Sequence, residues 1–293
     1  MALAISGCEQ SSKDQRENAT KPGESKHQTA SGADKLISQT RPAAQTKPGG
    51  KPVVVRVPAS APAAHAVGNI WGYSDPYIVH RAAGQITIDG NDHPEEWANA
   101  MVIENFLIPI TYEKPKRTTQ AKMLWDDQNL YVWFIAYDTD LRGTLKGKLA
   151  RVWTEDAVEL FLSPVFEKGS YYELELGPSN VLLALQIENT KRGSFQERAN
   201  WDHHIKTAVG VEGTINNPDD IDKYYRGVMA IPFTDLKFAG NKAPAISDTW
   251  RFNIPRCDLS KEFGDQQELS ACVPLPKIDF HISDNYGRMR FEK

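Results

Sequence analysis

The sequence predicts an all-β protein, an antiparallel β-sandwich of the jelly-roll type, over residues 70–293. Short segments that alternate apolar and polar residues follow one another along this region, and clusters of Gly, Pro, Asn and Asp separate them. No long segment has the spacing of apolar residues that an amphipathic helix needs. Many short alternating strands with turns between them are typical of sandwiches and barrels.

The clearest element is a hairpin over residues 120–137. Residues 120–125 alternate as a strand, residues 126–129 (Asp-Asp-Gln-Asn) form a polar turn, and residues 130–137 are rich in aromatic and β-branched side chains. The second strand is apolar on both faces. We therefore expect it to be a central strand that is covered on both sides.

Further strands are predicted on both sides of this hairpin, each bounded by turn residues. Residues 93–97 form a short helical turn with Pro at its start, and Trp97 is expected to be a core residue beneath it. The other predicted strands are 77–81, 85–88, 157–162, 171–176, 181–188, 204–212, 224–231, 249–257, 269–274 and 288–291.

Composition narrows the classes of function. The chain has 293 residues, a net charge of -4 and 40% hydrophobic residues, which is enough for one real core. An acidic balance argues against nucleic acid as a partner. No apolar run approaches the length of a membrane-spanning helix.

The first eight residues contain a motif that resembles a bacterial lipobox. Residues 5–8 read Ile-Ser-Gly-Cys, and in a lipobox Cys8 would be the lipidated residue. The apolar stretch before it is too short for a signal peptide, so we interpret residues 1–8 as a truncated lipoprotein signal whose start codon lies upstream of Met1. This predicts a lipid-anchored protein of the bacterial cell envelope that faces the periplasm or the cell exterior. The alternative is that Cys8 is an ordinary thiol.

Residues 9–69 are predicted to be a disordered linker. They are rich in Ser, Thr, Lys, Pro, Ala and Gly, and no aromatic residue precedes Trp71, although the chain has 7 Trp, 10 Tyr and 11 Phe. Such a segment cannot bury enough apolar surface to offset the entropy of ordering it. The globular domain therefore begins near residue 70.

Two cysteines lie in the globular part, in a predicted hairpin near the C-terminus. Cys257 and Cys272 could form a disulfide if the protein is exported, because disulfides persist in oxidising compartments. The sequence does not show whether the two residues lie opposite each other, so free thiols remain the equal alternative.

Several motifs, in this order, match one family. The residues that carry the match are Ile88-Asp89-Gly90 with Trp97, Leu124-Trp125-Asp126-Asp127 with Leu130-Tyr131-Val132, Trp153 with residues 155–161 (Glu-Asp-Ala-Val-Glu-Leu-Phe), Trp201, residues 230–233 (Ala-Ile-Pro-Phe), residues 250–253 (Trp-Arg-Phe-Asn) with Arg256, and Phe280-His281 with Tyr286-Gly287. The region from about Tyr77 to Lys293 resembles the DOMON-like family 9 carbohydrate-binding modules, in particular their stand-alone bacterial relatives.

The resemblance implies a sandwich that holds a sugar between two aromatic rings. Trp153 matches the first ring and Glu159 matches a carboxylate that binds hydroxyls. Phe280 falls where the sugar-binding modules have a second Trp, and Glu173 falls where they have an Arg, so this sequence departs from the family at both positions.

The residue types fit sugar chemistry independently of the resemblance. A pyranose has an apolar C–H face that packs on an aromatic ring, and hydroxyls that need directed hydrogen bonds. Trp153 supplies the ring. Ionised and amide groups supply strong hydrogen bonds, and the candidates for these are Glu159, Glu173, Asn253, Arg251 and Arg256. The alternative is that Trp153 only caps the sandwich edge while Glu159 pairs with a neighbouring Arg.

Family members also carry structural calcium, so Ca²⁺ is a further expectation from the resemblance, although its ligands cannot be matched one by one. Oxygen-rich turns that could hold Ca²⁺ contain Asp89, Asp92, Glu95, Asp126 and Asp127. Solvated turns are the more common explanation of such residues.

Other classes of function are less well supported by the sequence. Glycosidase chemistry needs a positioned carboxylate pair, and Glu155/Asp156 or Glu173/Glu175 are pairs that surface strands produce by default. His203, His204 and His281 lack a metal-binding spacing.

A haem-binding DOMON-type redox domain would need an axial ligand, for which Met123, Met229 or a His are candidates. An envelope or surface protein-interaction module that has lost sugar binding is the remaining alternative, because Phe280 replaces a Trp. The sequence therefore predicts a lipid-anchored β-sandwich that binds carbohydrate and is not an enzyme.

Overall fold

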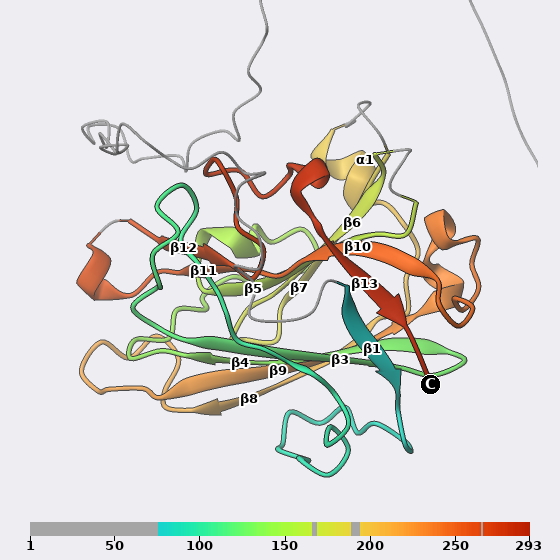
Figure 1. Ribbon diagram of the computed structural model, residues 1–293. Coiled ribbons are helices and arrows are strands. Elements are labelled where there is room, and N and C mark those ends of the chain that lie inside the picture. The colour runs from blue at the N-terminus through green and yellow to red at the C-terminus, as the bar shows by residue number, and fades with distance from the viewer. Residues whose placement is uncertain (1–75, 166–168, 189–193, 265) are drawn as a thin grey trace, which may run out of the picture. The chain divides into compact units, whose positions relative to one another are not determined.

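The computed structural model describes residues 76–165, 169–188, 194–264 and 266–293, all of which belong to one compact unit. The lipobox with Cys8 and the linker predicted over residues 9–69 lie outside the described residues. Figure 1 shows two layers of strands that face each other, with loops at their ends and only short helical segments.

The first layer is built around a central strand, β5, which lies between β10 and β11 on one edge and β6 on the other. Its path runs β12-β11-β5-β10-β13-β1, and β6 and β7 extend it from β5. The bounds of these strands are β1 (Tyr77–Arg81), β5 (Ala157–Ser163), β6 (Tyr171–Leu176), β7 (Leu182–Ile187), β10 (Thr249–Asn253), β11 (Pro255–Asp258), β12 (Glu268–Ala271) and β13 (Gly287–Phe291).

The second layer runs β1-β3-β4-β9-β8, with β2 beside β3. The predicted hairpin is confirmed: Thr119 of β3 pairs with Ala136 of β4, and Trp125 pairs with Leu130. As expected, β4 is a central strand, between β3 and β9. The bounds are β2 (Val102–Ile103), β3 (Thr119–Trp125), β4 (Asn129–Tyr137), β8 (Lys206–Glu212) and β9 (Tyr224–Pro232).

Strand β1 joins the two layers, and it is the exception to the antiparallel expectation. It pairs in parallel with β13, where Tyr77 lies beside Met289, and in parallel with β3, where His80 lies beside Leu124. The other pairings between described strands are antiparallel. Because β1 belongs to both layers, the sandwich is closed along this side like a barrel (Figure 1).

The main core fills the space between the layers. Alternation puts Val158, Leu160 and Leu162 of β5 into it from one side, and the matching apolar positions of β3, β4 and β9 enter from the other. Gly227 of β9 leaves room for Phe134, since a Cβ atom there would lie 2.2 Å from the Phe134 ring. The alternation that predicts the fold therefore also defines this core.

Each layer also has a covered outer face. On the second layer, Trp97 is buried against Trp133 with the ring centroids 6.5 Å apart, which confirms its predicted role as a core residue. On the first layer, a second apolar cluster includes Phe161, Leu185 and Phe280. We call this covered surface of β5, β6 and β7 the outer face, and it carries the candidate site.

Two details of the strand prediction are wrong. Residues 85–88 do not form a strand, because Thr87 bonds through its backbone N–H to the Glu96 carboxylate at 2.7 Å instead of to a neighbouring strand. Residues 249–257 are divided into β10 and β11 at Ile254, whose N–H bonds the Cys272 sulfur at 3.3 Å. The sequence does not predict the two-residue strand β2.

Within the described ranges, no helix is both long and apolar enough to cross a membrane.

Candidate functional site

Three glutamates meet on the outer face of the first layer. Alternation along β5 and β6 turns Glu159, Glu173 and Glu175 to the same side, where Glu159 lies opposite Glu175 and Glu173 lies opposite Phe161. One ligand atom from each lies within 4.8 Å of the others. All three are buried, with exposed fractions of 0–2%. We call them the glutamate cluster.

Each carboxylate of the glutamate cluster has a defined contact. The Cys257 thiol donates to Glu159 Oε1 at 3.2 Å, and the Trp153 backbone N–H donates to Glu175 Oε2 at 2.8 Å. Glu173 Oε2 lies 3.7 Å from His281 Nδ1. The cluster therefore anchors segments that cover the outer face, Trp153 among them.

Trp153 lies at the rim of this face, in a 3₁₀ turn, η2 (Val152–Thr154), that precedes β5. Its backbone is fixed on both sides, because the Gln267 side chain donates to its carbonyl at 2.9 Å while Glu175 accepts from its N–H. Its side chain is only partly buried. A rigid backbone with a partly exposed indole suits an aromatic ring that receives a ligand.

A second aromatic ring stands against Trp153. Phe195 begins the short helix α1 (Phe195–Ala199), and its ring contacts that of Trp153 edge to face, with centroids 5.9 Å apart. Ser194 starts this helix with a capping box: its side chain accepts from Glu197 N–H, and the Glu197 carboxylate accepts from Ser194 N–H at 2.6 Å. The capping box thus positions Phe195 beside Trp153.

Phe280 does not supply the second stacking ring. Its side chain is 1% exposed and packs edge to face on Phe161, with centroids 6.5 Å apart. Tyr286 donates its hydroxyl proton to the Phe280 carbonyl at 3.0 Å and closes the loop over it. In this structure a sugar cannot reach the Phe280 ring, because the ring is part of the apolar cluster under the loop.

Asn253 and Arg251 lie on the predicted face, but neighbouring groups use them. Asn253 pairs with Phe161 and Arg251 with Ser163 across β10 and β5. Asn253 is fully buried and accepts from Val273 N–H at 3.1 Å. Arg251, which is partly exposed, donates to the Tyr286 carbonyl at 3.1 Å. Both therefore brace the loops that cover the outer face.

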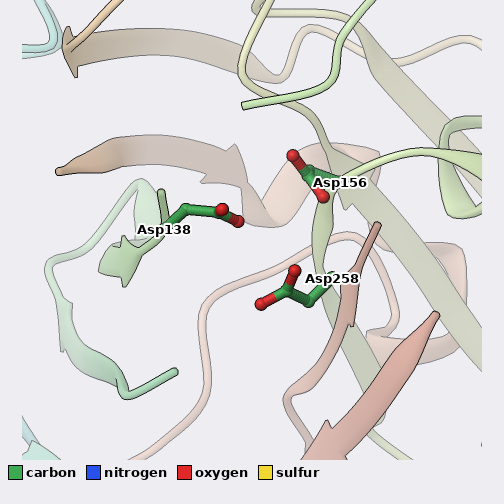
Figure 2. Close-up of side chains that lie close together, drawn as sticks. All are labelled: Asp138, Asp156 and Asp258. Carbon is green, nitrogen blue, oxygen red and sulfur yellow. The ribbon is translucent and has the colours of Figure 1, made fainter. Parts of the chain in front are cut away.

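Arg256 is on the opposite side of the sheet from the other predicted residues. It is 1% exposed and lies at one end of the main core, where it donates to Asp138 at 2.8 Å and to Asp258 at 3.0 Å. Figure 2 shows these two aspartates turned toward one another beside Asp156. Arg256 is thus a buried structural cation, and its predicted contact with a sugar is wrong for this structure.

The electrostatics of this second group of carboxylates, the aspartate cluster Asp138, Asp156 and Asp258, follow from burial. Burial raises the pKa of Asp138, although Arg256 opposes the shift, and burial followed by the charge of Asp138 raises the pKa of Asp156 well above its usual value. Burial disfavours the charge on Arg256, but Asp258 and Asp138 outweigh it and raise its pKa. Arg256 therefore pairs directly with two of the three acids, Asp138 and Asp258.

The aspartate cluster does not fit the calcium that the resemblance implies. Asp156 accepts from the backbone N–H groups of Arg142 and Leu259 at 2.6 and 2.7 Å. The other two carboxylates accept from Arg256 and Ser260, so each carboxylate oxygen in the cluster already receives a hydrogen bond. A guanidinium stands where a bound cation would be needed.

Four of the five carboxylates in the oxygen-rich turns, all except Asp92, have protein contacts. Asp126 accepts from the N–H groups of Gln128 and Asn129, both at 2.7 Å, and Asp127 pairs with Arg81 at 2.7 Å. Asp89 accepts from Asn91 N–H at 2.8 Å, and Glu95 lies near His93. Calcium binding therefore stays a prediction, and among the described residues the glutamate cluster is a further group of carboxylates that could provide ligands for it.

Cys257 and Cys272 are both free and buried, so the predicted disulfide is wrong in this structure. Cys257 pairs with Leu269 across β11 and β12, and its thiol points to Glu159 on the outer face. Cys272 belongs to the main core on the other side. The two side chains lie on opposite faces of one layer, where no S–S bond can form.

The two methionines that were candidate haem ligands are core residues in the structure. Met123 and Met229 are 0% and 1% exposed and pack among apolar side chains between the layers. The His203 ring contacts that of Trp201 in a tilted arrangement, and His204 pairs with Asp235 at 3.2 Å. These side chains have structural partners.

Sequence reasoning alone misses two residues of the site. In the sequence Glu175 is only half of a default carboxylate pair, although its spacing of two from Glu173 in a strand puts both on one face. Phe195 comes from a short helix beyond β7, and nothing in its local sequence signals that it contacts Trp153. Tertiary packing alone brings it there.

The structure defines a class by its fold: a β-sandwich whose rim carries the partly exposed Trp153 beside polar groups. A family model described as "Carbohydrate family 9 binding domain-like" matches residues 88–292. The chain belongs to this carbohydrate-binding family 9-like group. No curated protein sequence matches the chain significantly.

Three solved structures are similar to this chain, and the first of them supports the fold. A candidate carbohydrate-binding protein from Bacteroides uniformis ATCC 8492 is similar over 73% of this chain and 98% of its own, with 16% identity and a TM-score of 0.56. A family 9 carbohydrate-binding module from Caldicellulosiruptor kristjanssonii, in complex with cellotriose, covers 73% of this chain and 93% of its own, with 16% identity and a TM-score of 0.48. In complex with glucose, that module covers 95% of its own chain at a TM-score of 0.49.

Proposed function

We propose that this protein binds carbohydrate without transforming it, at the rim of the outer face around Trp153. The observation that carries the proposal is the partly exposed Trp153 ring on a backbone that Glu175 and Gln267 hold in place. Membership of the carbohydrate-binding family supports the same function. A preformed aromatic surface beside polar groups is what a sugar needs for binding.

The binding mode differs from the one that the sequence predicts. A sugar would place its C–H face on Trp153, with Phe195 at the side of that ring. Phe280 is covered, so the proposed mode uses one stacking ring instead of two. Glu159 and Glu173 lie beneath the covering segments, and a contact of either with a sugar hydroxyl stays a prediction.

The cellular setting is a further part of the proposal. The lipobox at residues 5–8 supports a lipid anchor on Cys8 and a place in the bacterial cell envelope, and residues 9–69 would serve as the tether. The relation to DOMON domains is proposed on the motifs alone. Labelling with a radioactive or clickable fatty acid, lost in Cys8→Ser, would test the anchor.

Titration calorimetry of the full chain tests the binding function. The ligand panel is glucose, xylose, cellotriose and xylotriose, each with and without 1 mM Ca²⁺, on the order of the free concentrations used for extracellular sites. We expect saturable heat with at least one sugar and a loss of about 10-fold or more in affinity in Trp153→Ala, since losing a stacked ring costs on the order of 1.4 kcal/mol.

Tyr137→Ala is the matched control, because Tyr137 is an aromatic residue that is 40% exposed and lies on β4 of the second layer, whereas Trp153 lies at the rim of the first. It is expected to bind like the unmodified protein. If Trp153→Ala bound sugar as tightly as the unmodified protein, Trp153 would not be part of the binding site. No heat with any sugar, from protein that circular dichroism shows to be folded, would favour the protein-interaction alternative.

A further inference from the structure

Two arginines stand at the same rim as Trp153. The Arg151 guanidinium carbon lies 5.9 Å from the ring centroid of Trp153 and 5.9 Å from that of Phe195. Arg198 comes from α1 and lies 6.0 Å from the Phe195 ring. These distances are those of cation–π contacts, which hold a guanidinium near an aromatic face. The aromatic pair is therefore edged by positive charge from two separate segments.

Neither arginine is neutralised by a carboxylate within the described ranges. The acid closest to Arg198 in the sequence, Glu197, is turned to Ser194 N–H in the capping box. Arg198 Nε is buried and has no hydrogen-bond partner there, and Arg151 is exposed. Both guanidinium groups therefore have N–H donors that could bind an acceptor on a ligand.

Lys148 belongs to the segment that precedes Trp153, and its charge acts on His203 beyond α1. Its proximity is evident at His203, whose pKa is lowered by burial and lowered further by the charge of Lys148. The segment before Trp153 and the segment after α1 therefore lie close enough for their charges to interact. The charges of Asp235 and Asp202 act on His203 in the opposite sense, so the positive charge beside Trp153 that the structure shows directly is that of Arg151.

The glutamate cluster lies behind this rim and not on it. Its three side chains are 0–2% exposed, and Glu175 accepts from the Trp153 backbone. A ligand that arrives from solvent meets Arg151 before any of these carboxylates, because Arg151 is exposed. Beside Trp153, the exposed charge of Arg151 is therefore more accessible to a ligand than the charges of the glutamate cluster.

We propose that the Trp153 site selects saccharides that carry an anionic substituent, such as the carboxylate of a uronic acid or a sulfate ester, with Arg151 and Arg198 as the specificity-determining residues. The inference rests on the proposed carbohydrate-binding function. Guanidinium groups bind planar and tetrahedral oxyanions through paired hydrogen bonds, which are stronger than those to neutral hydroxyls. The sugar ring would stack on Trp153 while its anionic group lies between the arginines.

The test measures affinity for matched sugars by calorimetry with the full chain. The probes are glucose, glucuronic acid and glucose 6-sulfate, with cellotriose and trigalacturonic acid as longer ligands, at low and high NaCl. We expect an anionic sugar to bind about 10-fold more tightly than its neutral partner at low salt, the effect of one charge-assisted pair. High salt should reduce this preference, and the carboxylate and sulfate arms identify which anion is bound.

Arg151→Gln and Arg198→Gln are expected to lower the affinity for the anionic sugar about 10-fold and to leave the affinity for the neutral sugar within about twofold. The matched control is Arg81→Gln, because Arg81 also contacts a Trp ring, that of Trp125 at 4.7 Å, but lies on β1. It should change neither affinity.

The outcomes separate this inference from the proposed function. If neutral sugars bind and anionic sugars bind no more tightly, or the arginine variants keep the preference, the anionic selectivity is wrong and the carbohydrate function stands. If no sugar of either kind binds to folded protein, both are wrong. If anionic sugars bind and both arginine variants lose them, while Arg81→Gln does not, the assignment is supported.

Discussion

Arg256 and Asp156 show how burial decides the role of a charged residue. Both are near the predicted sugar site in sequence, yet both lie at the end of the main core, where the Arg256 guanidinium pairs with Asp138 and Asp258 while Asp156 accepts from two backbone N–H groups. Three acids and one base in a buried space cannot all be ionised without cost. The raised pKa of Asp156 is the expression of that cost, and its causes are burial and the charge of Asp138.

The raised pKa gives a pH dependence with a definite sign. Since Asp156 holds its proton more tightly in the folded than in the unfolded protein, its contribution to stability is greatest at acidic pH and is lost as pH rises through the folded pKa. Asp156→Asn removes this contribution. We expect the free energy of unfolding of the variant, relative to that of the unmodified protein, to increase from about pH 4.5 to about pH 7.5. The increase should be up to about 1.4 kcal/mol for each tenfold difference between the acid dissociation constants of Asp156 in the folded and unfolded protein.

Urea denaturation at both pH values measures this difference, and comparing the two values cancels any pH-independent effect of replacing a carboxylate by an amide at two backbone N–H groups. Asp284→Asn, which changes an exposed acid, is the control and should show no such trend. A relative stability of Asp156→Asn that does not change with pH would mean that Asp156 is already ionised in the folded protein.

At the scale of strands, alternation predicts most of the fold because each strand has one face in the main core. It places Glu159 and Glu173 on a common outer face, which the register confirms. The same rule argues against grouping Arg256 with Arg251 and Asn253, since an even position in a strand faces away from odd ones. Alternation alone, applied from residue 251 to residue 256, would therefore have placed Arg256 on the core side of the sheet.

Other features of the site cannot be predicted from the alternation within single strands. The burial of Phe280 depends on which loop covers the outer face, and the contact of Phe195 with Trp153 depends on how α1 packs. The failed strand at residues 85–88 is similar, because Thr87 bonds to Glu96 instead of to a strand. Each outcome is decided by contacts between segments that are separated in the sequence, or by side-chain hydrogen bonds, and the alternation within one strand does not predict either.

Gly227 makes the packing of β9 testable. A Cβ atom there would lie 2.2 Å from Phe134 Cζ and 3.0 Å from Leu176, so Gly227→Ala forces the Phe134 ring to move inside a close-packed core. We expect a loss of about 1–3 kcal/mol in the free energy of unfolding, the usual cost of overpacking. Urea or thermal denaturation measures it.

Gly84→Ala is the matched control for this substitution, since nothing lies within 4 Å of a Cβ atom at that position. Its stability should be unchanged or slightly higher, because alanine restricts the unfolded chain. If Gly227→Ala were as stable as Gly84→Ala, β9 would not be packed against Phe134 as described.

At the scale of the whole domain, stability comes from two layers and their covered faces without a disulfide. Cys257 and Cys272 are free and buried on opposite sides of the first layer, and burial raises the pKa of Cys272 to about 12. Neither thiol is therefore expected to react readily in the folded protein, because the thiolate is the reactive form.

Reduction should consequently leave the melting temperature unchanged. A 15-residue disulfide loop would contribute about 3 kcal/mol, so a reducible bond would lower the midpoint by several degrees on addition of dithiothreitol. Titration with Ellman's reagent is expected to detect the two thiols of this region only after denaturation. Reaction of neither thiol in denaturant without reductant would show that they are linked after all.

The parallel placement of β1 between β13 and β3 has a mechanical consequence. A pull on the residues that precede Tyr77 acts along the length of β1, so its hydrogen bonds to both neighbouring strands are loaded in shear and must break together. The same strand lies beside the C-terminal strand, which spreads the load into both layers (Figure 1). A domain tethered from this end would resist being peeled open by a ligand attached to a large, moving polymer.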